Sequence, residues 1–195
     1  MNQKRNENVL LTLVILGIIL SVLLSACATT VITTPTTYKP SLLRKNPAEI
    51  SYYVDERLKT LTENYKGIVQ SYKLEVGSGL YSSIKNMLNE IFYNPDEIAE
   101  ITDKKNVIKF TYVNSNLTKE PGGRTFYKIE IRVEIFKNGK KIDDVVVSGE
   151  GECPTVLDDY KGVITIPEEG KISSERAITK VINQIGEFLN NYKFE

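Results

Sequence analysis

The chain has 195 residues, with 25 basic and 25 acidic side chains and no histidine. A net charge of zero without a basic patch gives no electrostatic basis for binding nucleic acid. The lack of histidine removes the commonest general base, the commonest zinc ligand and the Ser-His and Cys-His nucleophile pairs. We therefore expect a protein that is not an enzyme and that needs no metal or other cofactor.

Residues 1–27 show the ordered features of a bacterial lipoprotein signal peptide. Lys4 and Arg5 precede an apolar run over 9–24. This run is shorter than the ~20 residues that span a bilayer comfortably. It ends in Leu-Ser-Ala-Cys at 24–27, which resembles the lipobox of bacterial lipoproteins.

The lipobox resemblance implies cleavage between Ala26 and Cys27, a diacylglycerol group on the Cys27 thiol, and a fatty acid such as palmitate on the new amino terminus. The membrane is then the first partner of the protein, because two or three acyl chains anchor it stably. The alternative is an uncleaved transmembrane anchor with a chance cysteine at its end. Both readings place the rest of the chain outside the cytoplasm. Ala28 stands where many inner-membrane lipoproteins carry Asp, which favours the outer membrane in a bacterium with two membranes.

The segment after the anchor is rich in threonine and proline. Such a composition buries little apolar area, so we expect residues 28–47 to form an extended tether, functional or merely a spacer. The predicted organisation is a signal peptide over 1–26, the lipidated cysteine and tether over 27–47, and a single domain over 48–195. About 148 residues suffice for one core.

The first part of the predicted domain combines conflicting signals. Asn46-Pro47-Ala48-Glu49 is typical of a helix start, whereas Ile50, Tyr52 and Val54 alternate as in a strand. We favour the strand over 48–66, and a second extended segment over 68–76. Glycines 77 and 79 then open a helix, whose apolar face is formed by Leu80, Ile84, Met87, Leu88 and Ile91.

Three strands follow, over 107–117, 124–137 and 141–151. The middle strand alternates apolar and charged residues with a period of two, which predicts one buried and one solvated face. Asn138-Gly139 predicts a type I′ hairpin turn, and the Asp143-Asp144 pair predicts a bulge.

A final helix, capped by Ser173 or Ser174, is expected to bury one apolar stripe. The stripe is formed by Ile178, Val181, Ile182, Ile185, Phe188, Leu189 and Tyr192. The predicted fold class is α+β, with two layers: a mainly antiparallel sheet and two amphipathic helices on one of its faces.

Three segments carry a family resemblance. VGSGLYSSIKNMLNEIF over 76–92, VSGEGE over 147–152 and ERAITKVINQIGEFLNNY over 175–192 resemble small envelope lipoproteins. The most similar families are the YajG-like lipoproteins and the lipopolysaccharide-transport lipoprotein LptE. The resemblance implies a non-enzymatic accessory role and gives no ligand-binding residues.

Other candidate sites have a simple structural interpretation. Glycines 77 and 79 are more typical of a tight turn than of an anion cradle. The acidic pairs at 143–144, 158–159 and 168–169 have no metal-ligand spacing. Cys153, the one thiol left after lipidation, fits a small buried residue better than an intermolecular disulfide. Lys119 and Arg124 flank a loop that either connects two strands or contacts lipid phosphate or a partner.

The function expected from these features is that of a lipid-anchored accessory or scaffold subunit that docks on another envelope protein. The alternative is a binding module that holds an amphiphile or a glycan in a groove between helices and sheet. An enzyme is the least favoured class, because no catalytic motif occurs in the sequence.

Overall fold

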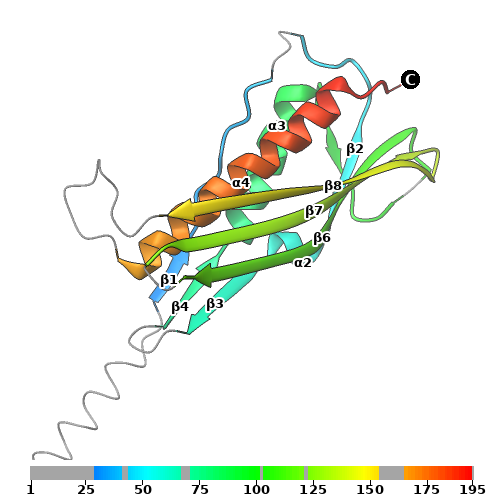
Figure 1. Cartoon of the computed structure of the whole chain (residues 1–195). Coiled ribbons are helices and arrows are strands. Elements are labelled where there is room, and N and C mark those ends of the chain that lie inside the picture. The colour runs from blue at the N-terminus through cyan, green and yellow to red at the C-terminus, as the bar shows by residue number, and fades with distance from the viewer. Residues whose placement is uncertain are drawn as a thin grey trace, which may run out of the picture.

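The computed structural model describes residues 29–40, 44–66, 71–101, 103–120, 123–153 and 165–194. In these ranges two β-sheets pack with two long helices (Figure 1). The predicted α+β class is confirmed, but two sheets take the place of the expected single one. The elements are β1 (Thr29–Ile32), β2 (Ser51–Val54), α2 (Glu56–Lys59), β3 (Thr62–Lys66), β4 (Ser71–Glu75), α3 (Gly77–Ile91), β5 (Asp96–Glu97), β6 (Asn106–Lys119), β7 (Thr125–Lys137), β8 (Lys140–Cys153) and α4 (Ile166–Asn191).

The larger sheet has the strand order β5-β2-β6-β7-β8, and the smaller has the order β1-β4-β3. Antiparallel pairing joins β6, β7 and β8, whereas β2 is parallel to both β5 and β6. In the smaller sheet β1 is parallel and β3 antiparallel to β4. The sheets meet where β3 contacts the second half of β6, and there the Ser115 hydroxyl donates a hydrogen bond to Glu63.

The region over 48–66 begins with the favoured strand, and no helix starts at the predicted signal over 46–49. Ile50, Tyr52 and Val54 are at most 4% exposed, as predicted for one buried side of a strand, but Ser51 is also buried, at 6%, so burial does not alternate strictly. A one-turn helix, α2, follows at once because the Asp55 carboxylate accepts a hydrogen bond from the Arg57 N–H. The chain then continues as β3.

The predicted hairpin between β7 and β8 is confirmed. Asn138 and Gly139 have φ values of 50° and 75°, as a type I′ turn requires. Ile135 pairs with Asp143 and Phe136 with Lys141, so Ile142 is the extra residue of a bulge beside the predicted acidic pair.

The core lies between the larger sheet and the two long helices. The apolar stripe of α4 meets the inward face of β7, where Ile129, Ile131, Val133 and Ile135 are all 0% exposed. On α4 the residues Ile178, Val181, Ile182, Ile185 and Leu189 are likewise fully buried, whereas Phe188 and Tyr192 are half-buried. These buried side chains fill the centre of the interface between α4 and the sheet.

The tether predicted over 28–47 is wrong for the described residues of that segment. Residues 29–32 form β1, paired with β4. Tyr38 is 5% exposed and packs on α4, where Gly186 leaves room for its ring: a Cβ there would lie 2.4 Å from Tyr38 Cε2. Asn46 forms a bridge with Phe92. Threonine is a strand former as well as a linker residue, so composition alone could not reveal this packing.

The start of the closing helix also differs from the prediction. α4 begins at Ile166, because Thr165 and Glu168 form a reciprocal capping box with Pro167 between them. Ser173 and Ser174 lie inside the helix, where their hydroxyls donate to the carbonyls of Gly170 and Lys171.

Candidate functional site

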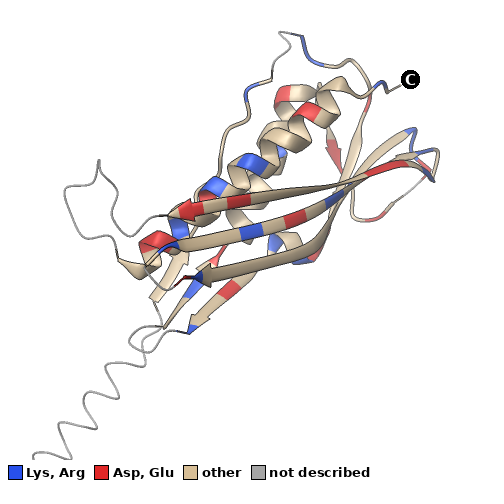
Figure 2. Cartoon of the chain, viewed as in Figure 1, with Lys and Arg blue, Asp and Glu red and all other residues tan. Residues whose placement is uncertain are grey.

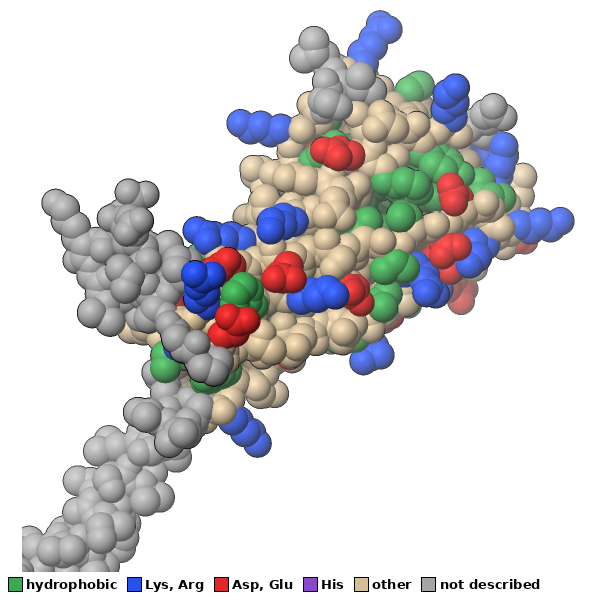
Figure 3. Space-filling model, viewed as in Figure 1, with side chains coloured by type: hydrophobic (Ala, Val, Ile, Leu, Met, Phe, Trp, Pro, Cys, Tyr) green, Lys and Arg blue, Asp and Glu red, His purple; other side chains and the backbone are tan. Residues whose placement is uncertain are grey.

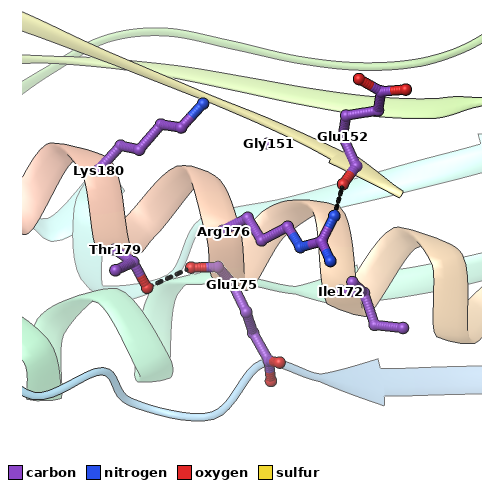
Figure 4. A pocket seen from close by; sticks show the side chains of 7 residues that line it. All are labelled: Gly151, Glu152, Ile172, Glu175, Arg176, Thr179 and Lys180. Atoms are coloured by element: carbon purple, nitrogen blue, oxygen red, sulfur yellow. Dashed lines mark hydrogen bonds between the residues drawn. The ribbon is translucent and has the colours of Figure 1, made fainter. Parts of the chain in front are cut away.

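A groove of about 600 Å³ lies between the end of β8 and the first half of α4. Its walls include Gly151, Ile172, Arg176 and Lys180 (Figure 4). The Arg176 guanidinium crosses the groove and donates a 2.6 Å hydrogen bond to the backbone carbonyl of Glu152. The groove therefore combines the apolar side chain of Ile172, two cations, the carboxylates of Glu152 and Glu175, and a strand edge.

Two glycines bring α4 into contact with the backbone of β8. A Cβ on Gly151 would lie 1.9 Å from the carbonyl oxygen of Ser173, and one on Gly149 would lie 2.2 Å from that of Ala177. Both distances are far below van der Waals contact. Strand glycines often mark such close approaches, so Gly149-x-Gly151 was a signal of this site that the sequence prediction did not use.

β8 is an edge strand of the larger sheet, and part of its outer edge is open. Antiparallel pairing points the backbone groups of alternate residues away from β7. Gln184 donates to the carbonyl of Ser148 and Arg176 to that of Glu152, so these residues face outward. By the same alternation Val146 and Glu150 also face outward, and no hydrogen bond from the described part of the chain reaches their outward backbone groups.

The N-terminal half of β8, next to the hairpin turn, adds exposed apolar side chains to this edge. Val146 is 47% and Ile142 is 52% exposed. Figure 3 shows hydrophobic side chains gathered between the C-terminal part of α4 and the outer half of the β7–β8 hairpin. There Phe188 and Tyr192 line a second hollow of about 380 Å³, and their ring centroids lie 5.6 Å apart.

Charges on the solvent face of the larger sheet alternate in sign along and between the strands (Figure 2). Lys109 pairs with Glu134 at 3.1 Å and Lys128 with Glu130 at 2.7 Å. Arg124 at the start of β7 lies 3.3 Å from Glu152. This face therefore presents mixed charges.

Glu97 is the centre of a second polar cluster, on the opposite edge of the sheet. Tyr81 donates a 2.6 Å hydrogen bond to its carboxylate and Lys59 a 3.1 Å one, while Lys85 lies 3.7 Å away. Burial alone raises the pKa of Glu97, but these hydrogen bonds and cations outweigh it and lower the pKa below 4.5. Burial and the carboxylate raise the pKa of Tyr81 to about 12. The cluster ties α2 and α3 to β5.

Several residues singled out from the sequence have structural roles. Gly77 is packed on α2, since a Cβ there would lie 2.3 Å from the Lys59 carbonyl oxygen, which confirms the tight turn. Cys153 is buried as a thiol, as predicted, and burial is the main cause that raises its pKa. Arg124 and Lys119 are both engaged in ion pairs. Cys27, Ala26 and the pair at 158–159 lie outside the described residues.

The acidic pairs within the described ranges divide into separate roles. Glu168 caps α4, whereas Glu169 is buried against Lys119. The Asp143 carboxylate accepts a hydrogen bond from the Asp144 N–H, and Asp144 itself pairs with Lys141. Among the residues that the structure describes, no group of three or more Cys, Asp or Glu side chains is arranged to hold a metal ion. None of the described helices has both the length and the apolar character to cross a bilayer.

Comparison with known proteins gives a likeness of fold. No protein-family model and no curated protein matches the sequence. The crystal structure of protein XCC0632 from Xanthomonas campestris, assigned to family DUF330, is similar with a TM-score of 0.50 and 13% identity over 83% of this chain and 93% of that one. A minor lipoprotein from Acinetobacter baumannii has a TM-score of 0.48 and 11% identity over 75% of this chain and 93% of that one. At 13% identity the likeness to the Xanthomonas protein is one of fold alone.

Proposed function

We propose that this protein is a lipid-anchored lipoprotein of the cell envelope. It acts as a non-enzymatic accessory or scaffold subunit and docks on another envelope protein through the outer edge of β8. In a bacterium with two membranes the anchor favours the outer one. The observation that carries docking is the open stretch of β8 around Val146 and Glu150, next to the groove against α4.

An open strand edge suits an extended segment of a partner protein. Backbone hydrogen bonds to β8 would provide affinity. Pockets beside the edge would bind alternate side chains of the added strand and so provide specificity. The groove at Ile172 and Arg176 supplies such a pocket, in which Arg176 and Lys180 lie beside Glu152 and Glu175. Natural edge strands are usually blocked by charge, proline or a covering element. Here α4 blocks the edge only in part.

The membrane anchor rests on the sequence of residues 1–27. The basic segment, the apolar run and Leu-Ser-Ala-Cys occur in the order that lipoprotein processing requires. Replacing Cys27 with Ala should abolish lipid labelling and leave a precursor of higher mass. A Cys27→Ala protein with unchanged mass and lipid content would refute the anchor.

A non-enzymatic role agrees with how the polar side chains are used. The sequence lacks histidine. Glu169, the most buried carboxylate among the described residues, accepts hydrogen bonds from Lys119 and Thr125. Glu97 is occupied in the same way by tyrosine and lysine donors.

Site-specific photocross-linking in the producing bacterium tests the docking edge. A benzophenone side chain is placed at Glu150 and, in a second strain, at Lys128, its cross-strand neighbour on the same face. We expect one discrete protein adduct from position 150 and little from position 128, because β8 is an edge strand whereas β7 lies inside the sheet. Equal labelling at both positions would refute edge docking. Co-extraction of an amphiphile with no protein adduct would favour the alternative function of a binding module.

A further inference from the structure

The distance between the predicted lipid and the folded domain is very short. β1 begins at Thr29, where it pairs with Tyr72 of β4. Cys27 precedes Thr29 by two residues, and an extended chain spans at most about 3.6 Å per residue. The Cα of Cys27 therefore lies within about 7 Å of that of Thr29, the first paired residue of the smaller sheet.

Thr29 lies at one end of the molecule, which we name the anchor-proximal end. It is formed by Thr29, Lys66, Ser71, Lys119 and Arg124. Lys66 pairs with Ser71 across β3 and β4, one step beyond the level of Tyr72. Lys119 pairs with Thr125, the residue after Arg124, and Thr125 pairs with Cys153 at the end of β8.

The two sheets present this end on the same side of the molecule (Figure 1). Glu63 of β3 accepts a hydrogen bond from Ser115 of β6. Lys66 follows Glu63 by three residues and Lys119 follows Ser115 by four, so the two strands, which run in the same direction, finish at nearly the same level. α4 also begins here, held by its Glu169 to Lys119.

We propose that the anchor-proximal end lies directly against the lipid headgroup layer of the membrane that holds the anchor. The inference rests on the proposed lipidation of Cys27. Because β1 runs from this end into the body, the chain enters the domain through the end rather than through a side. The β7–β8 hairpin turn then stands away from the membrane by the length of β7, about 40 Å for its 13 residues.

The chemistry of the end suits headgroups rather than hydrocarbon. The five residues that define this end carry Thr, Ser, Lys and Arg side chains, which can form hydrogen bonds and ion pairs with phosphate oxygens. Lys119 and Arg124 also pair with Glu169 and Glu152 of the protein itself. Lys66 is exposed and forms no ion pair with a described carboxylate, and the Arg124 side chain is 63% exposed. Contact of this end with the membrane also sets how far the groove lies from the headgroups. Ile172 and Lys180 follow the start of α4 by about 10 to 20 Å along the helix.

Depth-dependent fluorescence quenching tests this orientation. Single cysteines for a fluorophore are introduced as Lys66→Cys at the anchor-proximal end and Lys140→Cys beside the hairpin turn. The unsubstituted protein, whose Cys153 is buried, measures background labelling. The full-length, processed proteins are reconstituted into phosphatidylcholine vesicles that contain headgroup-nitroxide lipid. We expect strong quenching at position 66 and none above background at position 140.

A spacer variant is the matched control. About 15 flexible residues inserted between Ala28 and Thr29 add a mean reach of about 20 Å. Quenching at position 66 should then decrease while the lipid on Cys27 stays intact by mass spectrometry. Equal quenching at positions 66 and 140 would show that the domain lies on its side and would overturn the proposal. Absence of lipid on Cys27 would overturn the anchor itself, and the same mass measurement separates the two failures.

Discussion

Lys119 and Glu169 form an ion pair in which Nζ lies 2.9 Å from Oε2, although the glutamate side chain is only 1% exposed. The same oxygen accepts a 2.7 Å hydrogen bond from the Thr125 hydroxyl. The pair joins the first turn of α4 to the ends of β6 and β7. A buried carboxylate of this kind is stable only while its partners stay in place.

Replacing either member of this pair should destabilise the domain. We expect Glu169→Ala and Lys119→Met each to lower the free energy of unfolding by about 3 kcal/mol, because each leaves the other group without its partner. The double variant Glu169→Leu/Lys119→Met should cost less than the sum. Chemical denaturation measures all three, with Lys128→Met on the exposed sheet face as a control that should change stability little. Strict additivity would show that the two residues are not coupled.

Tyr38 anchors the segment before β2 to the core. Tyr38→Ala should lower the free energy of unfolding by about 3–5 kcal/mol, as for other buried aromatic residues. Tyr38→Phe should raise it by about 1 kcal/mol, because the buried hydroxyl has no hydrogen-bond partner among the described residues. Thermal and urea unfolding measure both, and the exposed neighbour variant Thr37→Ala is the control. A neutral Tyr38→Ala would restore the interpretation of this segment as a tether.

The stripe of α4 supplies the third prediction. Ile185 is 0% exposed, so Ile185→Ala should cost about 2–5 kcal/mol of stability. Lys180→Ala, which removes an exposed side chain at the wall of the groove, should cost under about 0.5 kcal/mol. Denaturant titration compares the two variants. An Ile185→Ala domain of unchanged stability would mean that the stripe is not the main packing face.

Glu97 should make stability depend on pH in the acid range. Its pKa in the folded state is lowered below the ordinary 4.5, so its contribution is present above that value and is lost as the pH falls through the lower folded pKa. Glu97→Gln should therefore cost about 1 kcal/mol at neutral pH and progressively less in acid. Denaturation of both proteins across a pH series measures the difference. A gap that grows below pH 4.5 would contradict this sign.

A proline on the free edge of β8 should impair partner binding without impairing the folding of the domain. Glu150→Pro removes an outward N–H that β7 does not use, and edge strands tolerate proline. We expect it to abolish the adduct formed from a cross-linker at Val146 and to change the melting temperature little. Glu150→Ala, which keeps the N–H, should preserve the adduct. An adduct that persists in the proline variant would exclude strand pairing at this edge.

The elements that local patterns specify were predictable. The alternation in β7, the Asn138-Gly139 turn and the Ile178 to Leu189 stripe each follow from one period or one turn type. The parallel pairing of β1 with β4 was not predictable, because it joins residues 43 positions apart. The packing of Tyr38 was not predictable either, because it depends on space at the distant Gly186. A threonine-rich strand at a sheet edge has the same composition as a linker.

The candidate site was largely hidden for a similar reason. An open edge depends on the order of strands in the sheet, and the local sequence of β8 does not indicate that it is an edge strand. Gly149 and Gly151 came closest to indicating the site, because glycines inside a strand predict a close neighbour. Their neighbour, the backbone of α4, could not be named from sequence. Cys27 was recognisable because lipoprotein processing reads a short contiguous motif.

The parallel alignment of β1 with β4 has a mechanical consequence. A force applied at Thr29 and directed out of the domain acts along the strand, so it loads the four residue pairs that join β1 to β4 in shear. Shear strains these pairs together, whereas peeling an antiparallel hairpin from its open end breaks them one after another. The strand nearest the anchor is thus attached in the direction that best resists a pull toward the membrane.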